Sequence, residues 1–199
     1  MKSIWKYLRT ILIYLPDSTK VEKYLELLKH SKRIPLMAPP DAHQFYQKHY
    51  LESSIYLPFL EGCQDVLDIG SGGGFPGIPL AIMNPSIHFY LLDKRIRCTN
   101  FLKEVCQELF LPNVTIITSR AEDLGRMSFK VDAVIARAVS RMYDILSWSI
   151  PVLRKNGYVI LGKKSEIERE AAHAEQLPYR LIKTIEQPFG LLVIYQTNE

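Results

Sequence analysis

"LDIGSGGGFPGIPL", residues 67–80, sets five glycines and two prolines directly behind a short apolar run that contains one acid, Asp68. This order predicts a buried strand, a glycine turn and the start of a helix. Glycine turns of this kind commonly hold a phosphate with backbone N–H groups. A carboxylate at the root of the turn would repel a phosphate, so a different kind of ligand is indicated.

The residues that follow alternate between strands and helices. Short apolar, β-branched runs bounded by turn residues predict strands at 64–70, 86–93, 113–119, 131–137 and 157–162. Helical stretches separate these runs, which is typical of a parallel sheet with helices on both faces. Two final runs, 179–187 and 191–197, are joined by a connection too short for a parallel crossover. We therefore expect an α/β fold, with a mostly parallel seven-stranded sheet that ends in an antiparallel C-terminal hairpin.

The first 60 residues differ from the rest in period and in charge. Apolar residues at three- and four-residue spacing, with three prolines in residues 33–40, predict three helices and an extended linker. We expect a helical extension over residues 1–60 that packs on a core domain of residues 61–199. The first 60 residues hold nine Lys and Arg against five Asp and Glu, whereas the remainder holds sixteen of each. Such an excess suits an anionic partner such as RNA, although a solvated helix face explains it at least as well.

Composition predicts a globular protein of the cytoplasm. The chain has 199 residues, of which 47% are hydrophobic and 23% charged, as is ordinary for one domain with an extension. Its best membrane candidate, residues 4–16, contains Lys6 and Arg9 and ends at Pro16, so we expect no membrane span. The three cysteines form no Cys-x-x-Cys pair, which argues against a disulfide framework and a zinc site. We expect a monomer without a metal.

Two phosphate-binding motifs do not fit the glycine turn. The dinucleotide fingerprint G-x-G-x-x-G, counted from Gly70, meets Phe75 in place of its third glycine. Counted from Gly72, the residues match the fingerprint. This match begins two residues late and includes Pro76, which has no N–H to donate. A P-loop requires Lys and then Ser or Thr after its glycines, and Gly77 is followed by isoleucine.

Read together with its acid, the turn is Asp68-x-Gly70-x-Gly72-x-Gly74. This pattern resembles motif I of the class I S-adenosylmethionine-dependent methyltransferases, which have a Rossmann-like fold. A carboxylate attracts the ammonium and sulfonium groups of that cofactor by about 1–4 kcal/mol at contact. Asp93 ends the next predicted strand, 23 residues after Gly70, where a carboxylate can accept hydrogen bonds from ribose hydroxyls.

A third acid follows the third predicted strand, in "SRAED", residues 119–123. In the methyltransferase arrangement, the backbone of Ala121 and Glu122 would meet the edge of the adenine. Each acid alone is more often a cap or turn residue. Acids after three consecutive strands point instead to one ligand.

The stretch after the fourth predicted strand limits the methyl acceptor. Methyltransferases of the adenine amino group have an Asn/Asp-Pro-Pro-aromatic turn there, whereas residues 135–140 read "IARAVS". Methylation of carbon 5 of cytosine needs a thiolate, and none of the three cysteines lies in a Pro-Cys pair. Both reactions are disfavoured.

Over about residues 20–195 the chain resembles the RsmG family, also called GidB. The resemblance is carried by "GSGGGFPGIPLAI", "FYLLD", "SRAEDL", "ARAVSRMYDIL" and "KHYLESSIYLPFL". It implies methylation of the 7-nitrogen of a guanine in 16S ribosomal RNA, with S-adenosylmethionine as cofactor and the RNA or the 30S particle as partner. That nitrogen has a lone pair and no proton, so direct in-line displacement needs no general base. We therefore assign no catalytic acid or base.

The resemblance also implies individual site residues. Those expected at the cofactor are Asp68, Gly70, Gly72, Gly74, Phe75, Asp93, Ala121, Glu122 and Arg137, and those expected at the RNA are Lys48, His49, Arg137 and Lys163. Three of them have alternatives. Arg137 could pair with a strand-end acid such as Asp68 or Asp132, Lys163 could be an ordinary surface lysine, and His49 could pack the N-terminal helices onto the sheet.

Several positions depart from the family pattern. They are Pro35-Leu36-Met37 for Asn-Leu-Thr, Arg97-Cys98 for Lys-Arg, Lys48-His49 for Arg-His and Glu52-Ser53 for Asp-Ser. These positions lie on or near the presumed RNA side, so they bear on the target nucleotide rather than on the cofactor. An RNA- or ribosome-binding protein that keeps the cofactor pocket without turnover, and a methyltransferase with another acceptor, remain alternatives. A basic N-terminal segment favours RNA over a small acceptor.

Overall fold

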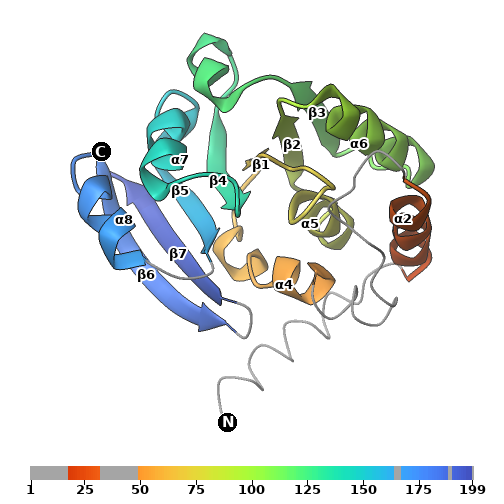
Figure 1. Cartoon of the computed structure of the whole chain (residues 1–199), viewed down its shortest axis with the longest axis horizontal. Coiled ribbons are helices and arrows are strands. Elements are labelled where there is room, and N and C mark those ends of the chain that lie inside the picture. Colours follow the sequence, from red (N-terminus) through yellow and green to blue (C-terminus); the bar gives the residue numbers. More distant parts are fainter. Residues whose placement is uncertain (1–17, 32–48, 164–166, 188–189, 199) are drawn as a thin grey trace.

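The computed structural model describes residues 18–31, 49–163, 167–187 and 190–198 (Figure 1). Its strands are β1 (Asp65–Ile69), β2 (His88–Asp93), β3 (Val114–Thr118), β4 (Val131–Arg137), β5 (Leu153–Lys163), β6 (Tyr179–Gln187) and β7 (Gly190–Thr197). Its α-helices are α2 (Ser18–His30), α4 (Leu51–Ser54), α5 (Gly77–Met83), α6 (Ile96–Glu108), α7 (Met142–Ser149) and α8 (Ile167–Ala174). Two 3₁₀ helices, η2 (Leu57–Phe59) and η3 (Ala121–Arg126), complete the described elements.

The strands of the described residues form one sheet in the order β3-β2-β1-β4-β5-β7-β6. Strands β1 to β5 are parallel neighbours, and β7 pairs antiparallel with both β5 and β6. This confirms the predicted α/β fold with its antiparallel C-terminal hairpin. The strand order reverses between β1 and β4, so the loops after these two strands lie at the edge where open α/β sheets bind ligands.

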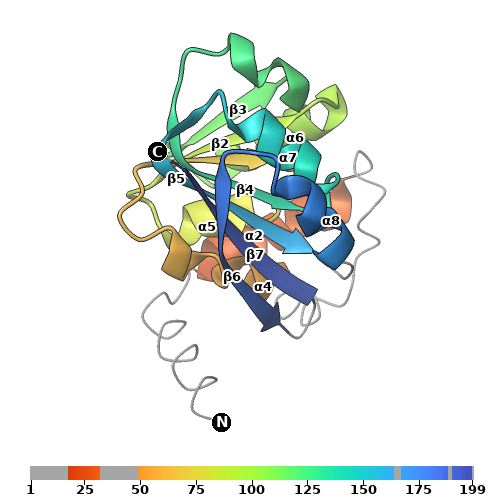
Figure 2. The same cartoon turned by 90° about the vertical axis from the view of Figure 1, so that its left-hand side faces the viewer.

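Side-chain alternation along β1 explains why helices cover both faces of the sheet (Figures 1 and 2). Successive residues of a strand point to opposite faces. Val66 packs in the apolar cluster that includes α2, α5 and α6, whereas Leu67 and Ile69 pack with α7 and α8. Asp68 shares the face of Val66 and therefore points toward α5.

Strand β5 begins at Leu153, four residues before the predicted start. The pairing of β4 with β5 shifts register after Val131 and Leu153, and Asn156 adopts a φ of 60°. Residues 154–156 are polar, so this irregular start has no alternating apolar pattern. The prediction missed it because pairing with β4, rather than local sequence, defines it.

Helix α2 packs against the core through residues at three- and four-residue spacing. Val21, Tyr24 and Leu28 are buried, as the amphipathic pattern predicted. The hydroxyl of Tyr24 also donates a hydrogen bond to the carbonyl of Gly73 at 2.5 Å, so α2 supports the glycine turn. Predictions for residues 1–17 and 32–48, including Lys48 and the proline linker, lie outside the described residues. The boundary expected at residue 60 stays a prediction.

No helix within the described ranges is long and apolar enough to cross a bilayer. In the same part of the chain, no group of three or more His, Cys, Asp or Glu side chains is placed to hold a metal ion.

Candidate functional site

The turn between β1 and α5 requires glycine for two different reasons. Gly70, Gly72 and Gly74 adopt φ values of 73°, 56° and 102°, which other residues rarely take. Gly77 is required for space, because a Cβ there would lie 2.7 Å from Oδ2 of Asp68. Because Gly77 has no Cβ, α5 can begin directly against the carboxylate of Asp68.

Asp68 is a buried carboxylate with an unused acceptor. Its side chain is 1% exposed, and the N–H of Gly77 donates to Oδ2 at 3.1 Å. Oδ1 is buried and has no hydrogen-bond partner in the described part of the chain. Burial raises the pKa of Asp68 to about 7, although the Gly77 hydrogen bond, the nearby Ser71 hydroxyl and the positive charge of Arg137 oppose the rise. Because Oδ1 is closed to solvent, Asp68 would act on a ligand at the turn through its charge, which attracts a cation and repels a phosphate.

Asp93, at the end of β2, lies on the other side of the same turn. Its Oδ2 accepts a hydrogen bond from the backbone N–H of Gly72 at 2.9 Å. Arg95 binds the carboxylate with its guanidinium, from Nε to Oδ1 at 3.0 Å and from Nη2 to Oδ2 at 2.9 Å. Burial alone would raise the pKa of Asp93, but the hydrogen bonds from Arg95 and Gly72 hold it below its usual value. The structure thus places Asp68 and Asp93 around one turn, and sequence reasoning missed Arg95.

Ala121 and Glu122 begin η3, soon after β3. Strand β3 pairs with β2 so that Thr118 lies beside Asp93, three residues before Ala121. Ala121 is buried, whereas the Glu122 side chain is half exposed and pairs with Arg120 at 3.0 Å. The expected contact of the backbone of Ala121 and Glu122 with the adenine stays a prediction.

A cavity of about 420 Å³ lies beside the end of β4 and carries a polar cluster on its wall. Nη1 of Arg137 donates to Oε2 of Glu52 at 2.7 Å, and Nη2 lies 3.1 Å from Nδ1 of His49. The guanidinium carbon of Arg137 is 5.5 Å from the ring centroid of Phe75, within cation–π range. Phe75 belongs to the glycine turn, so Arg137 connects the turn with the cavity.

The strand-end acids considered as alternative partners of Arg137 do not pair with it. Asp132 binds Arg154 at 2.8 Å, and the ion pair of Arg137 is made by Glu52, 85 residues earlier in the chain. Sequence reasoning treated Glu52 only as a departure from the family pattern. Its position three residues after His49 was the available signal, because that spacing places both side chains on one face of a helix. His49 lines the cavity and its ring centroid lies 5.0 Å from that of Phe75, while its contact with RNA stays a prediction.

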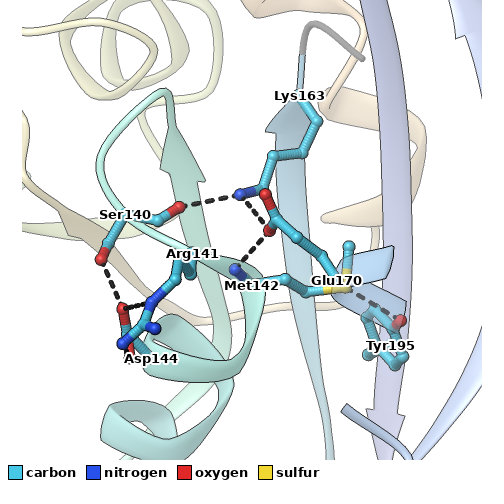
Figure 3. Close-up of polar contacts among 7 residues, drawn as sticks. All are labelled: Ser140, Arg141, Met142, Asp144, Lys163, Glu170 and Tyr195. Atoms are coloured by element: carbon cyan, nitrogen blue, oxygen red, sulfur yellow. Dashed lines mark hydrogen bonds and ion pairs between the residues drawn. The ribbon is translucent and has the colours of Figure 1, made fainter. Parts of the chain in front are cut away.

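Lys163, at the end of β5, is held in a polar network rather than extended into solvent (Figure 3). Its side chain is 12% exposed, and Nζ donates to the carbonyl of Ser140 at 2.8 Å and to Oε2 of Glu170 at 2.7 Å. The same Glu170 oxygen accepts the backbone N–H of Met142 at 2.6 Å. Lys163 is therefore not an ordinary surface lysine. It ties the loop after β4 to α8 while lining the cavity, and its contact with RNA stays a prediction.

The sheet order, the glycine turn and the acids near the carboxyl ends of β1 and β2 define a class I methyltransferase fold. Two solved structures share it. TrmN from Thermus thermophilus has a TM-score of 0.63 at 16% identity, over 85% of this chain and 52% of that chain. A SAM dependent methyltransferase from Aquifex aeolicus has a TM-score of 0.62 at 17% identity, over 84% of this chain and 97% of that chain. At such low identity these similarities show the fold alone.

The chain belongs to the GidB family, described as rRNA small subunit methyltransferase G, whose model matches residues 17–186. The relative of that name from Neisseria gonorrhoeae (strain NCCP11945) is 38% identical over 136 residues, which is 68% of this chain and 65% of the relative. Another, from Sorangium cellulosum, is 36% identical over 189 residues, 90% of this chain and 79% of the relative. The chain thus spans 65% of the length of the Neisseria relative. The family resemblance stated from the sequence is confirmed.

Proposed function

We propose that this chain transfers a methyl group from S-adenosylmethionine to the 7-nitrogen of a guanine in 16S ribosomal RNA. The observation that carries the proposal is the unsatisfied, buried Oδ1 of Asp68 beneath the glycine turn. When bound, the cofactor supplies a methyl group activated by its sulfonium. In this arrangement Asp68 attracts the cationic end of the cofactor, Asp93 accepts from the ribose, and the backbone of Ala121 and Glu122 borders the adenine.

The cavity beside Arg137 is the place we assign to the guanine. Its volume of about 420 Å³ lies within the range of pockets that enclose small ligands. The guanidinium of Arg137 and the ammonium of Lys163 lie on its wall, each paired with a carboxylate, so a nucleotide would have to share these donors with Glu52 and Glu170. Since the 7-nitrogen of guanine carries no proton, these residues need only align the base against the methyl group and exclude water.

Small-subunit ribosomal RNA, free or in the 30S particle, is the partner that agrees with the family description and with the basic first 60 residues. A ribosomal substrate would place the protein in the cytoplasm, where we expect it to act as a monomer.

Two measurements test the proposal. Isothermal titration with S-adenosylmethionine should show binding, which Asp68→Asn should weaken. Transfer of a tritiated methyl group to unmodified 30S particles or 16S RNA should then place 7-methylguanosine at one position. Binding without transfer to either substrate would favour an RNA-binding protein that retains the pocket. Absence of cofactor binding would overturn the proposal entirely.

A further inference from the structure

The carboxylate of Asp93 has no hydrogen-bonding capacity left. A carboxylate offers about four lone-pair positions. Oδ1 accepts from the backbone N–H of Arg95 at 2.9 Å and from its Nε at 3.0 Å. Oδ2 accepts from the N–H of Gly72 at 2.9 Å and from Nη2 of Arg95 at 2.9 Å. A ligand hydroxyl can therefore reach Asp93 only if one of these donors leaves.

Two of the donors are fixed and two can move. The N–H groups belong to the backbone of the glycine turn and to Arg95 as the N-cap of α6, so they stay while these elements are folded. The guanidinium is carried by a long side chain that is 36% exposed. Its departure would free one position on each oxygen of Asp93. Two adjacent free acceptor positions match the two hydroxyls of a ribose.

The guanidinium also lies against the turn where such a ligand would approach. A Cβ at Gly72 would be 3.5 Å from Nη2 of Arg95, which is ordinary contact distance. The flanking residues Lys94 and Arg97 are exposed and take no part in this pairing. Of these three basic residues, Arg95 is therefore the one whose guanidinium contacts both Asp93 and the glycine turn.

We propose that Arg95 competes with the ribose of the cofactor for Asp93. Without cofactor, the guanidinium caps the carboxylate and keeps it oriented. A ligand with both ribose hydroxyls displaces the guanidinium, and part of its binding free energy is used to break the ion pair. The inference rests on the proposed binding of S-adenosylmethionine.

Calorimetry on the full chain with S-adenosylhomocysteine and its 2′,3′-dideoxy analogue tests this inference. Arg95→Met removes the guanidinium but keeps the backbone N–H that orients Asp93. It should bind S-adenosylhomocysteine about tenfold more tightly than the wild type, since a half-exposed charged pair no longer has to be broken. The dideoxy analogue cannot replace the guanidinium, so its affinity should not change.

Arg97→Met is the matched control, because Arg97 is an exposed arginine in the first turn of α6, two residues after Arg95, and within the described residues it makes no hydrogen bond to Asp93. It should leave both affinities unchanged. Circular dichroism and urea unfolding establish that each variant is folded. Unchanged or weaker binding of S-adenosylhomocysteine by folded Arg95→Met would overturn the competition while leaving the proposed function standing. If neither the wild type nor this variant binds S-adenosylhomocysteine, the proposed function and the competition both fail.

Discussion

Asp68→Asn should change the pH dependence of stability. The Asp68 carboxyl has an ordinary pKa of 3.8 and a pKa of about 7 in the folded chain. Between these values the folded state holds a proton that the unfolded state has released, so stability falls as the pH rises. This stabilising effect is complete below about pH 4 and is lost as the pH passes about 7. At about 1.36 kcal/mol per pKa unit, the loss between about pH 5 and pH 8 is about 3 kcal/mol.

Urea unfolding of the wild type and Asp68→Asn at about pH 5 and about pH 8 measures this effect. The asparagine does not titrate, so the free energy of unfolding of the variant should rise by about 3 kcal/mol relative to the wild type between the two conditions. Asp93→Asn is the control with the opposite shift. Its pKa lies below the usual value, so the carboxylate is ionised in both states at both pH values and its effect should be constant. An Asp68→Asn difference that stays within about 0.5 kcal/mol would refute the raised pKa.

The same titration should govern cofactor binding. A cation prefers the ionised form of Asp68, so wild-type affinity for S-adenosylmethionine should fall as the pH drops below about 7, by up to about tenfold per unit. Calorimetry over this range should find weaker and nearly pH-independent binding by Asp68→Asn. If the wild-type affinity did not change with pH, the cofactor would not interact with the Asp68 carboxyl.

Three further substitutions, measured by urea unfolding, test the contacts that hold the glycine turn and the Lys163 network in place. Gly77→Ala should cost about 2–3 kcal/mol, because its Cβ would overlap neighbouring side chains at 2.3 and 2.7 Å. Gly125→Ala, with no neighbour closer than 3.8 Å, should differ from the wild type by less than about 0.5 kcal/mol, and equal effects would contradict the crowding. Glu170→Gln should cost about 1–2 kcal/mol, since its lysine partner is only 12% exposed, whereas Asp123→Asn removes an exposed pair and should cost nothing measurable. Tyr24→Phe should cost about 1 kcal/mol through the lost hydrogen bond to the glycine turn, and no loss would show that the bond contributes nothing.

The features that sequence predicted are those with a local pattern. Strand β4 was predicted with its observed bounds, and β6 likewise, because each is a run with its own boundary residues. Asp68 and Asp93 were found because each directly follows apolar residues of a strand, and parallel strands bring their carboxyl ends to one edge. Such patterns require no knowledge of distant partners.

The features that it missed depend on which side chains meet in space. The pairing of Arg137 with Glu52 joins residues 85 positions apart, one at the end of β4 and the other in α4. Arg95 lies only two residues after Asp93, yet nothing in the sequence shows that its guanidinium folds back onto the Asp93 carboxylate. The partners of Lys163 come from two different elements. For Arg137 and Lys163 the basic residue was recognised but not the acid that neutralises it, whereas for Asp93 the acid was recognised but not its partner Arg95.

The position of β7 between β5 and β6 has a consequence for the order in which the molecule can form. Strand β6 precedes β7 in the chain, yet in the described sheet it joins β5 only through β7. Residues 190–192, at the start of β7, also form part of the cavity wall. In a growing polypeptide, the residues of the glycine turn therefore emerge well before the strand that completes this part of the cavity wall. In a chain truncated before residue 190, the cavity would lack the part of its wall that β7 supplies.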